Sequence, residues 1–206
     1  MENFKENKNE IGIDEAGRGP FFGPVYAAAV IWGDAPDSEL IKDSKKLSKK
    51  KRGEAAQWIK DNIKFSGIGY CSSQEIDEFG IVNATKIAME RAINNIEEKY
   101  LLFNEKNTLL IDGIGWEKIE FNIKPKDFNI ISIIKGDSKY RNIAAASILA
   151  KEAHDLHIDE LCNNNEGFDQ KYDLLSNKGY GTKKHIDGIK KHGLSEFHRH
   201  SFNINY

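Results

Sequence analysis

The chain has few cysteines and no long apolar run, and each absence excludes a class of protein. Its two cysteines among 206 residues, Cys71 and Cys162, cannot form a disulfide framework or an all-cysteine zinc site. Such sparse use of cysteine is typical of a reducing compartment. No segment has the length of a membrane span, and the polar residues 1–10 lack the apolar core of a signal peptide. We therefore expect a soluble, cytoplasmic protein that does not bind membranes.

The chain also lacks an excess of charge of either sign. Its 30 lysines and arginines against 32 acids give a formal net charge of -2, so global basicity does not indicate a nucleic-acid partner. The basic residues gather instead in the segment Lys42–Arg52 and in the tail, where they are Lys178, Lys183, Lys184, Lys190, Lys191 and Arg199, with His185, His192, His198 and His200 nearby. Each segment is able to bind a polyanion, although such runs are also common on solvated helix faces.

Adjacent carboxylates, Asp14 and Glu15, lie between an apolar tripeptide and the small-residue run Ala16–Pro20. Repulsion and burial both disfavour two charged acids at the end of a buried strand unless a cation lies between them. Mg²⁺ and Mn²⁺ prefer such oxygen ligands, and Arg18 offers a permanent charge for a phosphate. The pair therefore indicates a metal site, and the alternative is an acidic pair that caps a turn.

Hydrophobic patterns predict an α/β fold with a mixed sheet and helices on both sides. Its length suits one domain, with room for a small appended subdomain. We expect strands at 11–14, 25–32, 65–71, 108–111 and 130–134. We expect helices from Ser48, as the N-cap, to about 63, from 72 or 73 to about 99 with an interruption near Gly80, and at 143–161 and 185–192.

Two further acids, Asp112 and Asp137, lie at or just beyond the ends of predicted strands. Loops converge at strand ends in α/β sheets, and sites assemble there. Each acid alone is better explained as a turn residue than as a catalytic one, but together with Asp14 they indicate one shared metal site. Asp155, on the following helix, is the rival fourth carboxylate, and we expect it to face solvent or to form a helix salt bridge.

The chain resembles the type 2 ribonuclease H family, ribonuclease HII. Seven segments carry the resemblance in the family's order over nearly the whole chain: Gly12–Pro20 (GIDEAGRGP), Asp43–Leu47 (DSKKL), Leu110–Gly113 (LIDG), Lys135–Lys139 (KGDSK), Ala144–Lys151 (AAASILAK), Lys178–Thr182 (KGYGT) and His198–Phe202 (HRHSF). Type 3 relatives carry an extra N-terminal domain and lack Gly-Arg-Gly in this loop. In this chain the first predicted strand begins about ten residues in, which favours type 2.

The resemblance implies a ribonuclease H-like mixed sheet flanked by helices, with a catalytic domain at 1–160 and a small helical substrate-binding extension at 161–206. It implies hydrolysis of RNA in RNA–DNA hybrids and incision at ribonucleotides embedded in duplex DNA, and so roles in DNA replication and repair. We expect a monomer whose partners are these nucleic acids.

The resemblance also implies the site residues. Asp14, Glu15, Asp112 and Asp137 would bind two Mg²⁺ or Mn²⁺ ions, with Asp14 bridging, so that water attacks the phosphodiester and leaves a 3′-hydroxyl and a 5′-phosphate. The loop of Gly17, Arg18 and Gly19 would read the ribose 2′-hydroxyl. Tyr180 would pack against that sugar, and Ser44 with Lys45 or Lys46 would contact phosphates. From the residues alone, Tyr180 is better explained as a half-buried aromatic of the tail that packs on the core.

Some positions depart from the family pattern. They are the Asn163–Tyr172 stretch, Leu194–Phe197 and His200. These departures affect the expected contacts with the substrate and not the expected chemistry.

Two other classes of function compete with the nuclease: a strand-transfer enzyme on the same fold, and a hybrid-binding module without activity. The first generally has wider acid spacing and no Gly-Arg-Gly after the first acid, and the second would be expected to lack one of the four acids.

Overall fold

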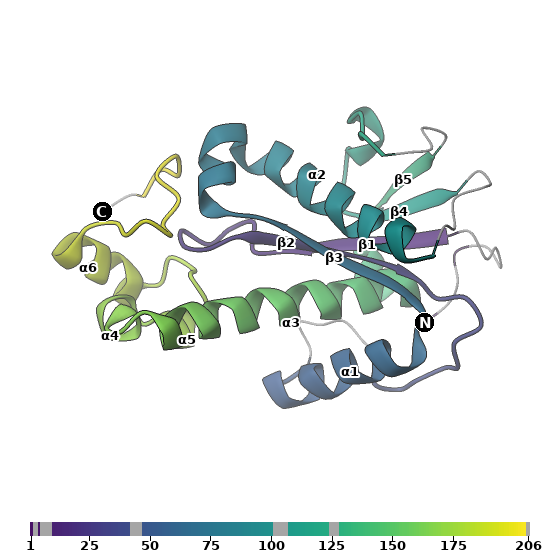
Figure 1. The fold of residues 1–206 in the computed structure, drawn as a ribbon, viewed down its shortest axis with the longest axis horizontal. Coiled ribbons are helices and arrows are strands. Elements are labelled where there is room, and N and C mark those ends of the chain that lie inside the picture. The colour runs from purple at the N-terminus through teal and green to yellow at the C-terminus, as the bar shows by residue number, and fades with distance from the viewer. Residues whose placement is uncertain (2–3, 5–9, 42–46, 101–106, 124–127, 205–206) are drawn as a thin grey trace.

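A computed structural model of the chain describes residues 1, 4, 10–41, 47–100, 107–123 and 128–204. A five-stranded sheet forms its centre, with strand order β3-β2-β1-β4-β5 (Figure 1). The strands are β1 (Glu10–Ala16), β2 (Val25–Ile31), β3 (Phe65–Cys71), β4 (Thr108–Asp112) and β5 (Asn129–Ile133). The pairs β1–β2 and β2–β3 are antiparallel, whereas β1–β4 and β4–β5 are parallel, so the predicted mixed sheet is confirmed.

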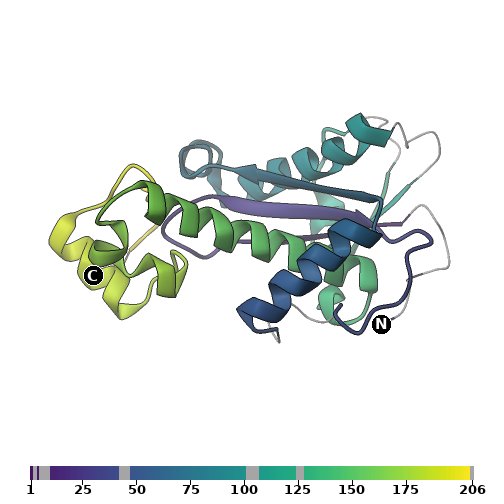
Figure 2. The same ribbon diagram turned by 60° about the horizontal axis from the view of Figure 1, so that its bottom comes forward.

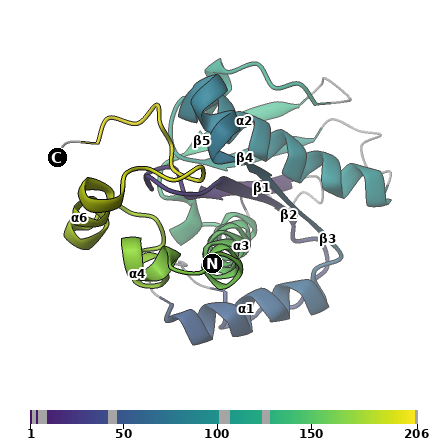
Figure 3. The same ribbon diagram turned by 60° about the vertical axis from the view of Figure 1, so that its left-hand side comes forward.

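Helices cover both faces of the sheet, as Figure 3 shows. On one face, α2 (Ser73–Tyr100) packs against Ile11, Ile13 and the odd-numbered residues of β2. On the other, α1 (Lys49–Asn62) and α3 (Arg141–Asn164) pack against Ala28 and Val30. Every residue of β2 is buried, which explains why its sequence is continuously apolar.

Glycine allows α2 to approach the sheet closely. A Cβ added at Gly67 would lie 2.1 Å from the carbonyl oxygen of Ala92, and one added at Gly69 would lie 2.3 Å from that of Ala88. Real side chains cannot be accommodated at such distances, so α2 packs directly on the backbone of β3 at these two positions.

The predicted helix boundaries agree closely with the structure. Ser48 caps α1 and its Oγ accepts from the Lys51 N–H at 3.4 Å. The interruption predicted in α2 is a kink at Gly80, where φ is 76° and ψ is 154°. The helix α3 begins two residues earlier than predicted and ends three residues later. No helix within the described ranges has both the length and the hydropathy that a membrane crossing requires.

The tail forms three short helices at the far end of α3 (Figure 2). They are α4 (Phe168–Tyr172), α5 (Leu174–Asn177) and α6 (Lys183–His192). The first two were not predicted, because five and four residues are too few to show a helical period. Their core contains Phe22, which is fully buried although it comes from the loop after β1. That loop is therefore held between the sheet and the tail.

Candidate active site

Three carboxylates meet at one end of the sheet. Asp14 and Asp112 follow the paired residues Ile13 and Ile111 on the parallel strands β1 and β4, and Asp137 lies in the short 3₁₀ helix η3 (Gly136–Ser138) just before α3. One oxygen from each carboxylate lies within 4.8 Å of the other two. The structure thus brings together three of the four acids predicted for the metal site.

The backbone around these acids fixes their positions. The Asp112 carboxylate accepts the Gly136 N–H at 2.6 Å, which ties β4 to η3. Asp14 accepts the N–H of Glu15 at 2.8 Å and is 4% exposed, and Asp137 is 3% exposed. The cluster is held by strand ends and a rigid turn rather than by flexible loops.

Burial and like charge act together on Asp14. Loss of water is the main cause that raises its pKa well above the ordinary value, and the neighbouring carboxylates of Glu15 and Asp112 raise it further, while a hydrogen bond from Ser147 lowers it. Charged forms can be stabilised there by a cation. An all-oxygen donor set of three carboxylates, with Asp14 and Asp137 buried and Asp112 half-buried, is the type that Mg²⁺ and Mn²⁺ prefer, so the residues fit such an ion.

Glu15 lies outside the group of three within the part of the chain that the structure describes. Its carboxylate is still close enough to raise the pKa of Asp14. Its Oε1 accepts from Arg18 at 3.2 Å, and its buried Oε2 has no hydrogen-bond partner among the described residues. Burial raises the pKa of Glu15, and Arg18 opposes that shift.

A cavity of about 230 Å³ extends from the acids to the tail. It joins the acidic pair to the Gly-Arg-Gly loop, one face of α3 and the tail tyrosine; its lining is Asp14, Glu15, Ala16, Gly17, Arg18, Gly19, Ser147, Lys151 and Tyr180. Tyr180 is 41% exposed. A Cβ on Gly19 would lie 3.5 Å from its ring, and the Lys151 Nζ lies 5.6 Å from the ring centroid. The predicted loop and the predicted tyrosine therefore share one cavity.

Arg199 holds the Gly-Arg-Gly loop from behind. Its fully buried guanidinium donates to the carbonyl oxygens of Gly17 at 2.6 Å and Arg18 at 3.0 Å. It also donates to those of Gly23 at 2.9 Å and Pro24 at 3.0 Å. Both ends of the loop are thus tied to one side chain. The tail basic segment was predicted as a polyanion-binding run or a solvated face, and for Arg199 both interpretations are wrong because the side chain is inside the protein.

His154 supports the same loop from α3. Gly17 has φ 89°, and a Cβ there would lie 2.4 Å from the His154 ring. The histidine Nδ1 contacts Asp155 at 3.1 Å. Only glycine suits both the backbone angle and the close approach at position 17.

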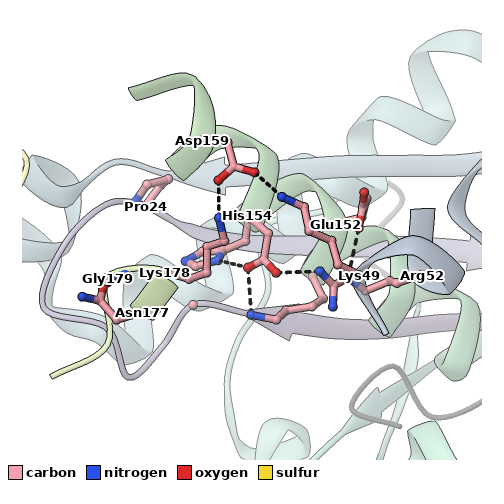
Figure 4. Close-up of polar contacts among 12 residues, drawn as sticks. Pro24, Lys49, Arg52, Glu152, His154, Asp159, Asn177, Lys178 and Gly179 are labelled. Atoms are coloured by element: carbon pink, nitrogen blue, oxygen red, sulfur yellow. Dashed lines mark hydrogen bonds and ion pairs between the residues drawn. The ribbon is translucent and has the colours of Figure 1, made fainter. Parts of the chain in front are cut away.

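A buried ion network lies beside the site on α1 and α3 (Figure 4). Arg52 pairs with Glu152 at 3.0 Å and with Asp155 at 2.7 Å, and Lys151 pairs with Asp155 at 2.8 Å. The pKa of Asp155 falls to about 2, because hydrogen bonds from His154 and Lys151 outweigh the effect of burial. The salt bridge predicted for Asp155 is confirmed, although the residue is buried rather than solvent-facing.

A second bridge joins α1, α3 and the tail. Asp159 accepts from Lys49 at 2.8 Å and also from Lys178, so Lys178 of the basic tail is engaged within the protein. The segment of Ser44, Lys45 and Lys46 lies outside the described residues.

Sequence reasoning assigned no role to Ser147 and Lys151, which line the cavity. The sequence contained a pattern that could have identified them. They are the polar residues at i and i+4 in the alanine-rich run 144–151, and residues with this spacing share a helix face. For Arg199 and His154 no local pattern distinguishes a buried side chain from an exposed one.

Known proteins share this sequence and fold. The family profile described as Ribonuclease HII matches residues 11–205. A ribonuclease HII of Pelagibacter ubique (strain HTCC1062) is 42% identical over 193 residues, which are 93% of this chain and 94% of that protein.

Two solved structures share the fold. One is the complex of PCNA with RNase HII from Archaeoglobus fulgidus, with a TM-score of 0.67, 23% identity and coverage of 93% of this chain and 92% of that one. The other is ribonuclease H2 from Pyrococcus horikoshii OT3, with a TM-score of 0.66, 21% identity and coverage of 94% and 93%. With the family match over almost the whole sequence, these findings show that the chain belongs to the ribonuclease HII family of hydrolytic nucleases.

Proposed function

We propose that this chain is a metal-dependent endoribonuclease that hydrolyses RNA in RNA–DNA hybrids and incises duplex DNA at embedded ribonucleotides, leaving 3′-hydroxyl and 5′-phosphate ends. One observation carries the proposal: Asp14 belongs both to the cluster of three acids and to the cavity that the Gly-Arg-Gly loop and Tyr180 line. Such a surface can hold a phosphodiester at the acids while the adjoining sugar lies against the loop and Tyr180.

Asp14, Asp112 and Asp137 would hold Mg²⁺ or Mn²⁺, with Glu15 as the fourth carboxylate. The burial of Asp14 and Asp137 and the raised pKa of Asp14 favour a bound cation over four unbalanced charges. When bound, two such ions supply an activated water and neutralise the leaving 3′ oxygen. The protein's own contribution is to hold the carboxylates in place through strand ends and the Gly136 contact.

Discrimination of RNA from DNA would come from the loop and the tyrosine. The 2′-hydroxyl is both a donor and an acceptor and is the group that distinguishes the two sugars. Backbone groups of Gly17, Arg18 and Gly19 reach it without an intervening side chain, and Arg199 keeps that backbone in one conformation. Tyr180 would then limit the sugar to one orientation.

Substrate phosphates would be bound by Ser44, Lys45 and Lys46, just before α1, and by exposed lysines of α6. We also propose that residues 161–206 are the substrate-binding extension of a catalytic domain at 1–160. The helix α3 crosses this boundary and ends at Asn164, so the two parts share one continuous element.

The experiment is single-turnover cleavage of three labelled duplexes: an RNA–DNA hybrid, a DNA duplex with one ribonucleotide and an all-DNA duplex. We expect cleavage of the first two in Mg²⁺ or Mn²⁺, none in EDTA, and none of the third. Asp14→Asn should abolish cleavage, whereas Asp61→Asn, a change at an exposed acid of α1, should not.

Other results would support the competing functions. Binding of the hybrid by the wild type without cleavage in either metal would favour a binding module. Cleavage or joining of the all-DNA duplex would favour a strand-transfer enzyme. Undiminished turnover by Asp14→Asn would contradict the assignment of the acids.

A further inference from the structure

Two histidines of the tail lie in contact with each other, and one of them contacts the backbone of Tyr180, which lines the cavity. His185 of α6 and His198 are both fully buried, and their Nε2 atoms are 3.1 Å apart. Neither lines the cavity. A polar contact between two buried rings requires that exactly one of the facing nitrogens carry a proton if both rings are neutral.

The surrounding backbone fixes which nitrogen that is. The Ser195 N–H lies 2.9 Å from the Nδ1 of His198, and a backbone amide can only donate. That Nδ1 is therefore an acceptor, and the proton of His198 is on Nε2, from which it is donated to His185. The proton of His185 must then be on its Nδ1, which lies 3.0 Å from the carbonyl oxygen of Tyr180. Every donor in this series of hydrogen bonds, from Ser195 to Tyr180, therefore faces an acceptor.

Burial keeps both rings neutral. It lowers the pKa of His198 to about 3 and also lowers the pKa of His185. Rings of Tyr172 and Phe22 lie against His198, with centroids 4.8 Å and 5.0 Å away. The chain of hydrogen bonds from Ser195 to Tyr180 therefore has one direction and one protonation state at neutral pH.

This series of hydrogen bonds ends at Tyr180, whose ring lies on the cavity wall. The ring of Tyr180 is 41% exposed, so packing restrains it little. Its backbone is restrained instead: the N–H donates to Asn177 at 3.0 Å, and the carbonyl accepts from Thr182 at 2.8 Å as well as from His185. Lys178 and Gly179, just before it, both have positive φ, so this turn depends on such contacts.

We propose that His185 and His198 are positioning residues that fix Tyr180 against the substrate sugar, through a directed hydrogen-bond chain that begins at the Ser195 amide. The proposal rests on the function proposed above for Tyr180. It adds two residues that do not touch the substrate, and it assigns the tautomer of each.

The first test needs no variant. Histidine ring nitrogens of the ¹⁵N-labelled wild-type protein report their tautomers by NMR. We expect His198 with its proton on Nε2 and His185 with its proton on Nδ1 at pH 7. The opposite tautomers, or a charged ring at either position, would overturn the proposed chain whatever the enzyme cleaves.

The second test separates positioning from general stability. His185→Leu removes both hydrogen bonds, whereas His185→Asn keeps an amide near the place of Nδ1 and can still donate to the Tyr180 carbonyl. We expect the Leu variant to slow single-turnover incision at one embedded ribonucleotide by roughly 10- to 100-fold, and the Asn variant to recover most of the rate. His192→Leu, an exposed histidine on the same helix, is the matched control.

A double-mutant cycle with Tyr180→Ala completes the test. If His185 acts through Tyr180, His185→Leu has no further effect on incision once Tyr180 is alanine, because the two changes remove the same interaction. Additive losses would overturn the inference. Tyr180→Ala that incises at the wild-type rate would instead contradict the proposed function of Tyr180. Thermal melting monitors folding, and if His185→Leu does not fold, His198→Gln replaces it in the cycle.

Discussion

At the residue scale, Asp14, a ligand of the proposed cation site, destabilises the fold when it is ionised and no cation is bound. Its carboxylate lies under α3 with the charge of Asp112 nearby, and both burial and that charge raise its pKa. The pKa is therefore higher in the fold than in the unfolded chain. Ionised Asp14 consequently lowers the free energy of unfolding at every pH above the folded value.

The first prediction follows from this sign. In EDTA at neutral pH, Asp14→Asn should melt at a higher temperature than the wild type, by about 2–4 °C for each kcal/mol of repulsion and desolvation removed. Added Mn²⁺ should raise the melting temperature of the wild type more than that of the variant. Calorimetry of both proteins with and without the ion measures this. Equal melting temperatures in EDTA would mean that the carboxylate is well solvated or balanced.

A second prediction concerns Arg199, whose one guanidinium spans two ends of a loop. Lysine keeps the charge but cannot donate to four carbonyl groups in that geometry. Since each hydrogen bond to a charged donor contributes about 1.5–3 kcal/mol, Arg199→Lys should lower the free energy of unfolding by at least about 3 kcal/mol. It should also speed amide hydrogen exchange in residues 17–24.

Urea denaturation and exchange mass spectrometry measure the two effects. Arg91→Lys is the matched control, because Arg91 pairs with Glu75 at the surface and such pairs contribute about 0–1 kcal/mol. Unchanged exchange in the loop of Arg199→Lys would show that other contacts hold it.

At the element scale, local patterns predicted the helices and strands well. Ser48 and Gly80 were found because caps and breaks depend on neighbouring residues alone. The strand order was not predicted, since pairing joins β1 to β4, which is about a hundred residues away. Nor could the sequence show that Arg199 and His198 of the basic tail are buried, because burial depends on what packs over them. The sequence predicted that Asp14, Asp112 and Asp137 lie together since strand ends are visible in the sequence, but that Glu15 lies outside this group of three needed the geometry.

The third prediction belongs to the kink in α2. Gly80 has dihedral angles that side chains rarely adopt, yet nothing lies within 4 Å of a Cβ placed there. Gly80→Ala should therefore destabilise by about 1–3 kcal/mol through backbone strain alone. Gly53→Ala, in the middle of α1, should stabilise by about 0.5–1 kcal/mol, because alanine favours a regular helix. Urea denaturation of both variants tests the pair, and a neutral or stabilising change at position 80 would show that the kink straightens.

At the scale of the whole molecule, buried histidines connect the tail and α3 to the rest of the protein. His154, His185 and His198 are fully buried, and burial lowers the pKa of each. Below about pH 6.5 these three histidines bind protons in the unfolded chain, but they do not bind them in the folded protein. Acidification therefore favours the unfolded state.

The fourth prediction gives the size of this effect. Because the pKa of His198 in the fold is about 3, this residue alone should lower the free energy of unfolding by about 2 kcal/mol between pH 7 and pH 5. Asp155, with a pKa of about 2, contributes a loss only below about pH 4. Urea denaturation in EDTA at pH 7, 6 and 5 measures the slope, which should be smaller in His198→Gln. A flat profile for the wild type would mean that the rings are charged or accessible in the fold.

The hydrogen bonds from Arg199 to the carbonyl groups of the Gly-Arg-Gly loop have a consequence for the timing of synthesis. The Arg199 guanidinium bonds to a carbonyl 182 positions earlier in the chain, and ribosomes add roughly 5–20 residues per second. The loop after Asp14 is thus made roughly 10 to 40 s before the side chain that fixes it. Asp137 is also made before Arg199, so a nascent chain has all four acids before the loop is held in place, and the proposed selection of a ribonucleotide would arise among the last events of its biosynthesis.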